Sequence, residues 1–240
     1  MPMPPSLIAS LAPTGKLRVA INFGNPVLAR READGSAGGI TADIGRELAR
    51  RVGTDVVFVD FEQAGDVVAA LDRGAWDICF LAIEPVRAAR IDFTEPYVLI
   101  EGVYLVPSTS MLRSAAEVDR SGTRIGVIVG SAYDLFLTRE LKHASLLRLP
   151  GPEAVVDALT RGEVNLIAGV KPQLEADARR VEGSRLLPEA FMSIRQAMGT
   201  PRGRAEAAAY ASQFIAALKC CGFMREAFAR NRIEGASLAP

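Results

Sequence analysis

The sequence has no excess of either charge, little cysteine and a single histidine. Lysine plus arginine and aspartate plus glutamate each total 28, so the formal net charge is zero. Without a field that would collect polyanions, a nucleic-acid partner is not expected. The three cysteines, Cys79 and the adjacent Cys220 and Cys221, form neither a disulfide framework nor a C-x-x-C zinc motif. We therefore expect no metal and no cofactor, and cysteine usage leaves the cellular compartment open.

Long hydrophobic runs are also missing. Runs such as 98–100 and 127–129 are far shorter than the roughly 20 residues that span a bilayer, so membrane insertion is not expected. The N-terminal run 1–5 lacks a basic segment, and 7–12 is too short for the hydrophobic part of a signal peptide. The sequence predicts either that a signal was removed or that the protein is not exported.

What is present is a globular composition with alternating strand and helix patterns. Hydrophobic residues make up 49% of the chain and charged residues 23%, which allows a buried core. Strands separated by helices of about ten residues indicate a parallel sheet with crossovers. Asp43 is expected as a helix-start charge and Trp76 as a packing residue. The predicted elements are strand 16–22, helix 41–52 capped by Thr41, strand 56–61, helix 66–73 ending at Gly74, and strand 78–83.

An internal sequence repeat divides the chain into two similar halves. The segment 67–74 matches 155–162 at six of eight positions, and each copy ends in glycine. A polar residue, Asp77 or Asn165, then precedes an apolar run in both halves. The second half also repeats the opening, with a strand at 124–129 followed by a helix that Ser131 and Asp134 would begin as a capping box. We therefore expect two α/β lobes.

The residues after the buried strand 78–83 are the strongest functional candidates, because open α/β sheets bind ligands at this edge. Pro85 restrains Glu84 and can open a short helix, which places Arg87 on its first turn. The planar guanidinium of Arg87 suits bidentate binding of a carboxylate. The alternative is that Arg87 forms a surface ion pair with Asp92 or Glu84.

Three motifs resemble the extracellular solute-binding proteins that serve polar amino acid ABC transporters. They are the opening strand Gly15-Lys16-Leu17-Arg18-Val19, the helix start Gly39-Ile40-Thr41-Ala42-Asp43-Ile44, and Glu84-Pro85-Val86-Arg87 followed by Asp92-Phe93-Thr94-Glu95-Pro96-Tyr97. The resemblance runs from about Gly15 to Phe228. It implies a two-lobed periplasmic-binding-protein fold of the venus flytrap type, each lobe a mainly parallel sheet with flanking helices. Lobe one would comprise 1–105 plus 196–240 and lobe two the inserted stretch 106–195, with two hinge crossings.

The resemblance also implies a ligand site. Arg87 would bind a ligand carboxylate, helped by the helix start at Gly130 and Ser131, although an ordinary N-cap explains that pair equally. Three positions depart from the family pattern: Ala82 replaces Ser or Thr, Asn25 replaces an aromatic residue before proline, and Val170 replaces the aspartate that pairs with a ligand ammonium. The full set of expected ligand-binding residues is Arg87, Glu84, Ala82, Phe80, Asn22, Asn25, Gly130, Ser131, Ala132, Tyr133 and Val170.

Val170 bears on the choice of ligand. Placing an ammonium against valine without a paired carboxylate would cost several kcal/mol. We therefore expect a small carboxylate whose recognition does not depend on an α-ammonium. The open alternative is that Glu84, Glu101 or Glu175 supplies the missing charge.

Two classes of function fit these residues. The first is the binding component of an ABC-type uptake system, not an enzyme, which closes two lobes on a small carboxylate-bearing metabolite. A permease partner, a monomer and a periplasmic location are then expected, with a cytoplasmic location as the alternative. The second is a lyase on the same fold, similar to cyclohexadienyl dehydratases, with Glu84 or Glu175 as general acid. A sensory domain cut from a larger receptor is a third possibility.

Overall fold

The computed structural model describes residues 3–240, so Met1 and Pro2 of the N-terminal run lie outside the described residues. The chain divides into two compact units. Unit 1 comprises the residues up to Val98, Arg195–Glu234 and Leu238–Pro240, and unit 2 comprises Leu99–Ile194 and Gly235–Ser237. The first change of unit thus comes earlier than the expected 105–106 boundary, because β7 (Val98–Pro107) pairs with strands of unit 2. The tail 235–237 was expected in lobe one.

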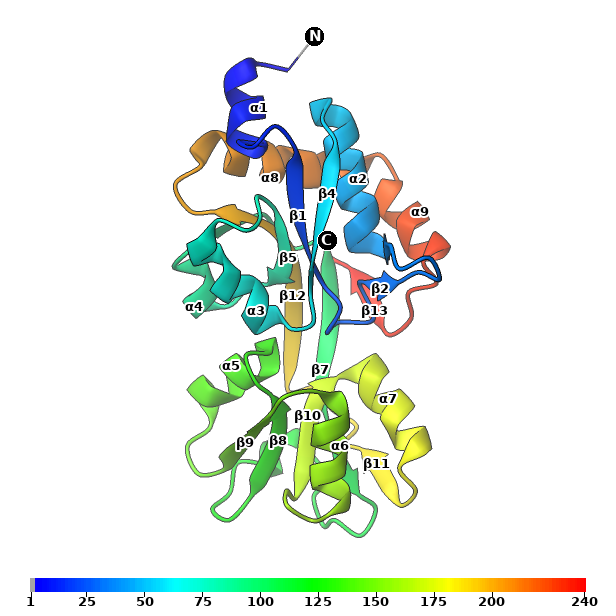
Figure 1. Ribbon diagram of the computed structural model, residues 1–240. Coiled ribbons are helices and arrows are strands. Elements are labelled where there is room, and N and C mark those ends of the chain that lie inside the picture. The colour runs from blue at the N-terminus through cyan, green and yellow to red at the C-terminus, as the bar shows by residue number, and fades with distance from the viewer. Residues whose placement is uncertain (1–2) are drawn as a thin grey trace. The chain divides into compact units, whose positions relative to one another are not determined.

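Unit 1 is built around parallel strands flanked by helices (Figure 1). Its first strand, β1, runs parallel to β4, with Leu17 opposite Val56, and Val19 bridges to Ile78 beside β5. The returning strand β12 lies antiparallel to β5 and β6. The elements are α1 (Pro5–Leu11), β1 (Leu17–Asn22), β2 (Arg30–Arg31), β3 (Ala37–Gly38), α2 (Ile40–Val52), β4 (Val56–Phe61), α3 (Ala64–Ala69), η1 (Ala70–Arg73), β5 (Cys79–Ala82), α4 (Pro85–Ala88), β6 (Ile91–Phe93), β12 (Met192–Pro201), α8 (Ala205–Cys220) and α9 (Phe223–Arg230).

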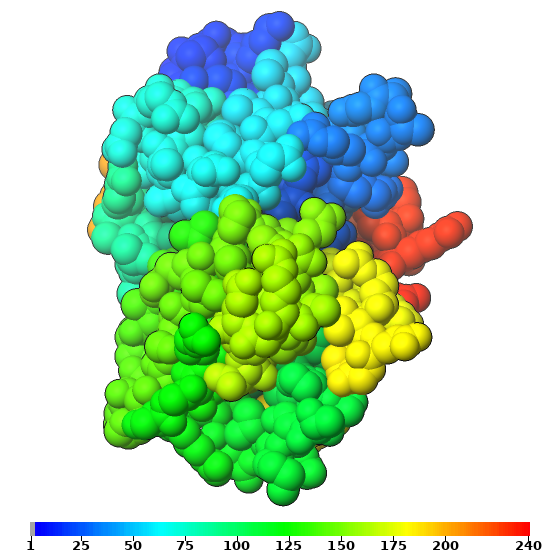
Figure 2. All heavy atoms as spheres, turned by 60° about the horizontal axis from the view of Figure 1, so that its bottom comes forward, coloured from blue at the N-terminus to red at the C-terminus, as the bar shows by residue number. Residues whose placement is uncertain are grey.

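Unit 2 has the same kind of sheet. Strand β8 lies between β9 and β10 and is parallel to both, and β10 continues antiparallel to β7. Helices α6 and α7 pack against β10 and lie side by side at the surface of this unit (Figures 1 and 2). The elements are β7, η2 (Ala115–Glu117), β8 (Arg124–Ile128), α5 (Ala132–Glu140), β9 (Ser145–Leu149), α6 (Pro152–Thr160), β10 (Leu166–Val170), α7 (Lys171–Arg180), β11 (Ser184–Leu186) and β13 (Ala236–Leu238).

The predicted internal repeat is confirmed, and its two copies share the same hydrogen bonds. Gly74 and Gly162 both have positive φ, of 57° and 70°, which stops the helix before each. In unit 1 the carboxylate of Asp77 accepts from the Arg18 backbone N–H at 3.1 Å, and the Asp77 N–H donates to the Arg18 carbonyl at 2.8 Å. In unit 2 Asn165 makes the same two bonds with Arg124, at 2.7 and 2.9 Å. The polar residue after each repeat therefore joins two neighbouring strands.

The start of α2 differs from the prediction. Thr41 does not cap the helix; its hydroxyl donates to the Leu28 carbonyl at 3.1 Å. The N-cap is Gly39, with φ of 98° and ψ of 173°. A Cβ at this position would lie 2.4 Å from the Leu28 carbonyl oxygen, so only glycine fits both the backbone angles and the space.

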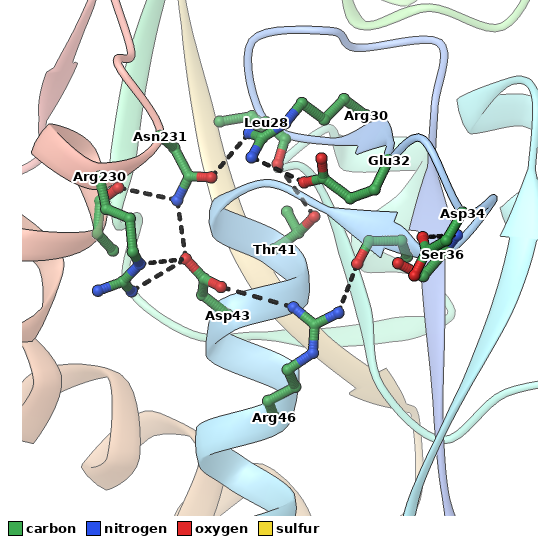
Figure 3. A network of polar contacts seen from close by, with 12 residues as sticks. Leu28, Arg30, Glu32, Asp34, Ser36, Thr41, Asp43, Arg46, Arg230 and Asn231 are labelled. Atoms are coloured by element: carbon green, nitrogen blue, oxygen red, sulfur yellow. Dashed lines mark hydrogen bonds and ion pairs between the residues drawn. The ribbon is translucent and has the colours of Figure 1, made fainter.

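A polar network surrounds the first turn of α2 (Figure 3). Asp43 accepts from Arg230 at 3.0 Å and from Asn231 at 2.8 Å, which joins α2 to the end of α9. Asn231 in turn accepts from Arg30 of β2 at 2.8 Å. On the other side of Asp43, Arg46 donates to the Ala37 carbonyl at 2.6 Å. Asp43 thus has the predicted place at the helix start and also connects three segments of unit 1.

In the part of the chain that the structure describes, no single helix is long and apolar enough to cross a membrane. The helices α8 and α9 together pass this test of length and composition, with a bend of 73° between them.

Candidate functional site

The turn between β5 and α4 holds the main group of predicted site residues in unit 1. Strand β5 is buried along its whole length, and the chain then leaves it through Glu84. Glu84 has extended angles, with φ of −134°, because Pro85 follows it and begins the helix. The Glu84 carbonyl accepts from the backbone N–H of Arg87 at 2.9 Å. Arg87 therefore lies on the first turn of α4, as predicted.

Arg87 is buried, with only 2% of its surface exposed. Its Nη1 donates to the Ala82 carbonyl at 3.1 Å, and Glu84 beside it is 4% exposed. Burial lowers the pKa of Arg87 to about 10, and the negative charge of Glu84 acts in the opposite direction. The hypothesis of a surface ion pair is wrong, since Arg87 is not at the surface and Asp92 lies 3.6 Å from Arg202 instead. A protonated guanidinium is held inside unit 1.

Phe80 of β5 and Tyr97 are buried aromatic residues of unit 1. Phe80 is 4% exposed and meets Tyr97 edge to face, with the ring centroids 5.9 Å apart. The Tyr97 hydroxyl is buried without a hydrogen-bond partner among the described residues, and burial raises the pKa of Tyr97. Burial also raises the pKa of the Cys79 thiol. Ala82, where the family pattern has a hydroxyl residue, offers the arginine only its backbone carbonyl.

The two predicted asparagines lie at and after the end of β1. Asn22 is the last residue of the strand, and its Oδ1 accepts from the Gly24 N–H at 3.1 Å. Asn25 is 9% exposed, and its carbonyl accepts from the backbone N–H groups of Leu28 and Ala29 at 3.0 and 3.1 Å. Its Oδ1 is buried without a partner in the described part of the chain. Asn25 thus stabilises a turn and presents a polar atom that no described group satisfies.

Unit 2 contributes the start of α5. Ser131 is the N-cap, and its hydroxyl accepts from the Asp134 N–H at 3.0 Å, which confirms one half of the predicted capping box. The Asp134 carboxylate returns to accept from the Gly130 N–H at 2.9 Å. Asp134 is 3% exposed and also contacts Arg148 at 2.9 Å. The sequence showed Asp134 only as half of a capping box, because Arg148 is distant in sequence.

This arrangement changes the electrostatics expected at the helix start. Two N–H groups that could have bound an external anion already donate within the protein. The Asp134 carboxylate is in turn paired with Arg148 at 2.9 Å, so the helix start holds a balanced ion pair of the protein's own. Ala132 and Tyr133, the next predicted residues, are 8% and 7% exposed and pack as helix residues. The geometry of unit 2 thus supports the N-cap alternative more strongly than an anion site.

Val170 ends β10, opposite Gly102 of β7, and is the N-cap of α7. The residue after it, Lys171, forms an ion pair with Glu101, with Nζ and Oε2 2.6 Å apart. Both line a cavity of about 600 Å³ in unit 2, whose walls include Phe191 and Met192. The sequence did not predict this pair, because Glu101 and Lys171 are brought together only by the pairing of β7 with β10.

The described residues contain no group of three or more His, Cys, Asp and Glu side chains that could hold a metal ion. The cysteines are free, with Cys79 buried and Cys220 and Cys221 exposed. The β5–α4 turn brings a buried guanidinium, that of Arg87, next to a buried carboxylate, that of Glu84.

Comparison with known proteins places this geometry in context. No curated protein sequence matches the chain. Among solved structures, the solute receptor for L-cysteine of Neisseria gonorrhoeae has a TM-score of 0.81 at 22% identity, over 97% of this chain and 99% of that chain. A mutant of ArgBP from T. maritima has a TM-score of 0.77 at 18% identity, over 95% and 100%. The ancestral amino acid-binding protein AncCDT-1, a precursor of cyclohexadienyl dehydratase, has a TM-score of 0.75 at 17% identity, over 93% and 97%.

At these identities the likeness shows the fold, which is that of two-lobed α/β periplasmic binding proteins. The family of bacterial extracellular solute-binding proteins, family 3, matches residues 17–230. This range contains β1, the helix start at Gly39 and the β5–α4 turn with Arg87. By its sequence and its fold, the chain belongs to the bacterial extracellular solute-binding proteins, family 3.

Proposed function

We propose that this chain is the solute-binding component of an ABC-type uptake system, and that it binds a small carboxylate-bearing metabolite, an amino acid or a related acid, through Arg87. The observation that carries the proposal is the burial of Arg87 at the end of β5, with 2% of its surface exposed. Burying a guanidinium is costly unless it binds an anion or accepting groups. The guanidinium is a planar fork of N–H donors, which suits binding of a carboxylate.

The proteins of known structure that resemble this chain support a small, polar ligand. The neighbours include a receptor for L-cysteine and a binding component of an ABC transporter from Wolinella succinogenes, which was solved in complex with lysine. We further propose that the protein acts as a monomer outside the cytoplasm and delivers its ligand to a membrane permease; the family's description as extracellular solute-binding proteins supports the location. The expectation that the two lobes close on the ligand stays a prediction.

Arg87→Ala tests the proposal directly. Loss of a charge-assisted bidentate pair should weaken binding of small carboxylates by about a hundredfold or more. Arg87→Lys should recover only part of the affinity, because an ammonium cannot reproduce the planar fork. Isothermal titration calorimetry with a panel of amino acids and 2-hydroxy acids measures both effects.

The matched control for this test is Arg90→Ala. Arg90 follows Arg87 by three residues but contacts Asp72 at the surface, with side-chain exposures of 41% and 71%. It should leave affinity unchanged. Equal affinity in wild type and Arg87→Ala, with the circular dichroism spectrum preserved, would contradict the proposal.

The lyase alternative requires a protonated carboxylic acid at the site. Glu84 is the buried candidate, whereas Glu175 is only partly buried on α7. One observation keeps this alternative open: a relative of the same fold is a precursor of a dehydratase. Nuclear magnetic resonance of hydroxy acids incubated with the protein distinguishes the two functions, since a lyase releases an unsaturated product and a binding protein returns the acid intact.

A further inference from the structure

The cavity of about 600 Å³ in unit 2 has the size of a binding site for a small molecule. Such pockets usually measure about 300–1,000 Å³. All of its lining residues belong to unit 2, whereas Arg87 belongs to unit 1, so an inference from this cavity does not depend on the proposed function. Six of the eleven lining residues have apolar side chains, namely Leu99, Ile100, Ala190, Phe191, Met192 and Ala236.

The backbone of β7 holds the apolar wall of this cavity. The Phe191 N–H donates to the Gly102 carbonyl at 2.9 Å. A Cβ on Gly102 would lie 2.7 Å from Cγ of Met192 and 3.2 Å from Cζ of Phe191, so both side chains pack directly on the strand. Phe191 also stacks on Tyr104, with the ring centroids 4.3 Å apart. The wall therefore contains an aromatic ring and a thioether, and both make favourable contacts with an aromatic ligand.

An ion pair forms the polar part of the lining. Nζ of Lys171 donates to Oε2 of Glu101 at 2.6 Å, and the two side chains are 38% and 52% exposed. A lysine carries three N–H donors and a glutamate two acceptor oxygens, and this bond uses one of each. A hydroxyl or an amide both donates and accepts, so one such group can bond to both side chains. Ser193 and Ser237 add hydroxyls to the lining.

The two charges of the Glu101–Lys171 pair cancel. A charged ligand would lose part of its hydration in the cavity without gaining a net counter-charge. It would also compete with one partner of the pair for the other. An uncharged ligand leaves the pair intact and bonds to the donors and acceptors that the pair does not use. The lining therefore favours a ligand without charge.

We propose that this cavity is a second ligand site, which takes an uncharged aromatic molecule bearing a hydroxyl or amide group. The aromatic ring contacts Phe191 and Met192, and the polar group bonds to Glu101 and Lys171.

Three naphthalene derivatives test the charge preference: 2-naphthol, 2-naphthoate and 2-naphthylmethylammonium are neutral, negative and positive at pH 7. Nuclear magnetic resonance of the methionine methyl groups reports binding, because the naphthalene ring current shifts the Met192 signal, and Met192→Leu identifies that signal. 2-Naphthol should bind with a dissociation constant below about 1 mM and the two ions at least about fivefold more weakly. The signals of Met111, 81% exposed, and of Met198 in unit 1 should not move.

Removing one charge of the pair should change the preferred compound. Glu101→Gln leaves Lys171 without its counter-charge, so this variant should prefer 2-naphthoate to 2-naphthol by at least about threefold. Lys171→Gln should prefer 2-naphthylmethylammonium for the same reason. Glu175→Gln is the matched control, because Glu175 acts on Lys171 from α7 without lining the cavity. It should keep the preference for 2-naphthol.

A blocking variant tests the location. Ala190 lines the cavity and is exposed, so Ala190→Trp should fill space there without disturbing the core and weaken 2-naphthol at least about tenfold. Glu189→Trp is its control, since Glu189 is also exposed but does not line the cavity, and its affinity should stay at the wild-type value. Equal affinity of wild type for the three compounds would overturn the inference. So would an unchanged Met192 shift in an Ala190→Trp protein that keeps the wild-type circular dichroism spectrum.

Discussion

Asp77 is a buried carboxylate of unit 1 that contacts two arginines. Its side chain is fully buried, and its Oδ1 lies 2.8 Å from Arg18 and 2.8 Å from Arg204. Its backbone bonds to Arg18 also join β1 to the segment before β5. Asn165 makes the equivalent backbone bonds in unit 2 without any charge. The comparison indicates that the bond to the neighbouring strand needs only a polar side-chain oxygen. The negative charge of the Asp77 carboxylate is needed to pair with Arg18 and Arg204.

Asp77→Asn should therefore destabilise unit 1 through charge alone. The amide oxygen can keep the bond to the Arg18 N–H, as Asn165 does with Arg124, but it leaves two partly buried guanidinium groups without their counter-charge. We expect a loss of roughly 2–3 kcal/mol, reduced from the value for a fully buried pair because both arginines are about a quarter exposed. Urea unfolding measures it.

Asp72→Asn is the control for this change. Asp72 pairs with Arg90 at the surface, and exposed pairs contribute about 1 kcal/mol or less. A loss at Asp77 no larger than the loss at Asp72 would show that solvent already screens the buried carboxylate.

At this scale the sequence predicted the residues whose conformation is set locally. Pro85 fixes the backbone of Glu84 and the helix position of Arg87. The spacing of Ser131 and Asp134 likewise predicts that Ser131 is the N-cap of α5. Burial of Arg87 and the contact of Asp134 with Arg148 could not be predicted, because both depend on segments brought together by the fold. The burial of the Tyr97 hydroxyl, which has no hydrogen-bond partner among the described residues, could not be predicted for the same reason.

Helix α2 shows how one element is stabilised by its own charges. Glu47 contacts Arg50 at 2.8 Å and Arg51 at 2.7 Å, at spacings of three and four residues. The bonds from Arg50 and, to a smaller extent, from Arg51 lower the pKa of Glu47 from 4.5 to about 2, although partial burial acts in the opposite direction. A carboxyl whose folded pKa is depressed stabilises the protein above its ordinary pKa, and this contribution is lost as the pH falls toward the folded value.

Wild type should therefore be more stable than Glu47→Gln at pH 7, and the difference should shrink between pH 4.5 and pH 2. Its size should be about 0.5–1 kcal/mol, because Arg50 is 71% exposed and solvent screens the pair. Urea unfolding across this pH range measures the difference. Replacing Arg50 and Arg51 with alanine should remove the same pH-dependent component, and a pH-independent difference would contradict the assignment.

Most elements could be predicted because their hydrophobic period is regular. Strand β4 matches its predicted bounds, and α2 begins one residue before its prediction. The cap of α2 was wrong because Thr41 is a good capping residue by type, but its hydroxyl bonds to Leu28 across the fold. Short strands such as β2 and β3 have too few residues to show a period.

The whole molecule consists of two units with the same kind of sheet, and the residues of the short C-terminal tail are divided between the two units. The residues Gly235–Ser237 belong to unit 2, where β13 pairs with β7. Trp76, the only tryptophan, lies fully buried in unit 1. Its fluorescence therefore reports the unfolding of unit 1 alone. The repeat in the sequence predicted two lobes, but a three-residue segment carries no pattern that could have assigned it to the second.

Gly235 determines how this tail fits on unit 2. It has φ of 66°, and a Cβ would lie 2.5 Å from Cγ of Pro172, whose ring cannot turn away. Gly235→Ala should destabilise unit 2 by about 1–3 kcal/mol and increase hydrogen exchange in β13. Gly183 has a similar φ of 72°, but a Cβ there would meet open space. Gly183→Ala should therefore show the backbone cost without the clash, about 1 kcal/mol.

The unfolding midpoint followed by Trp76 fluorescence should stay unchanged in both variants. An equal shift of the Trp76 signal and of hydrogen exchange would instead show that the two units unfold as one cooperative body.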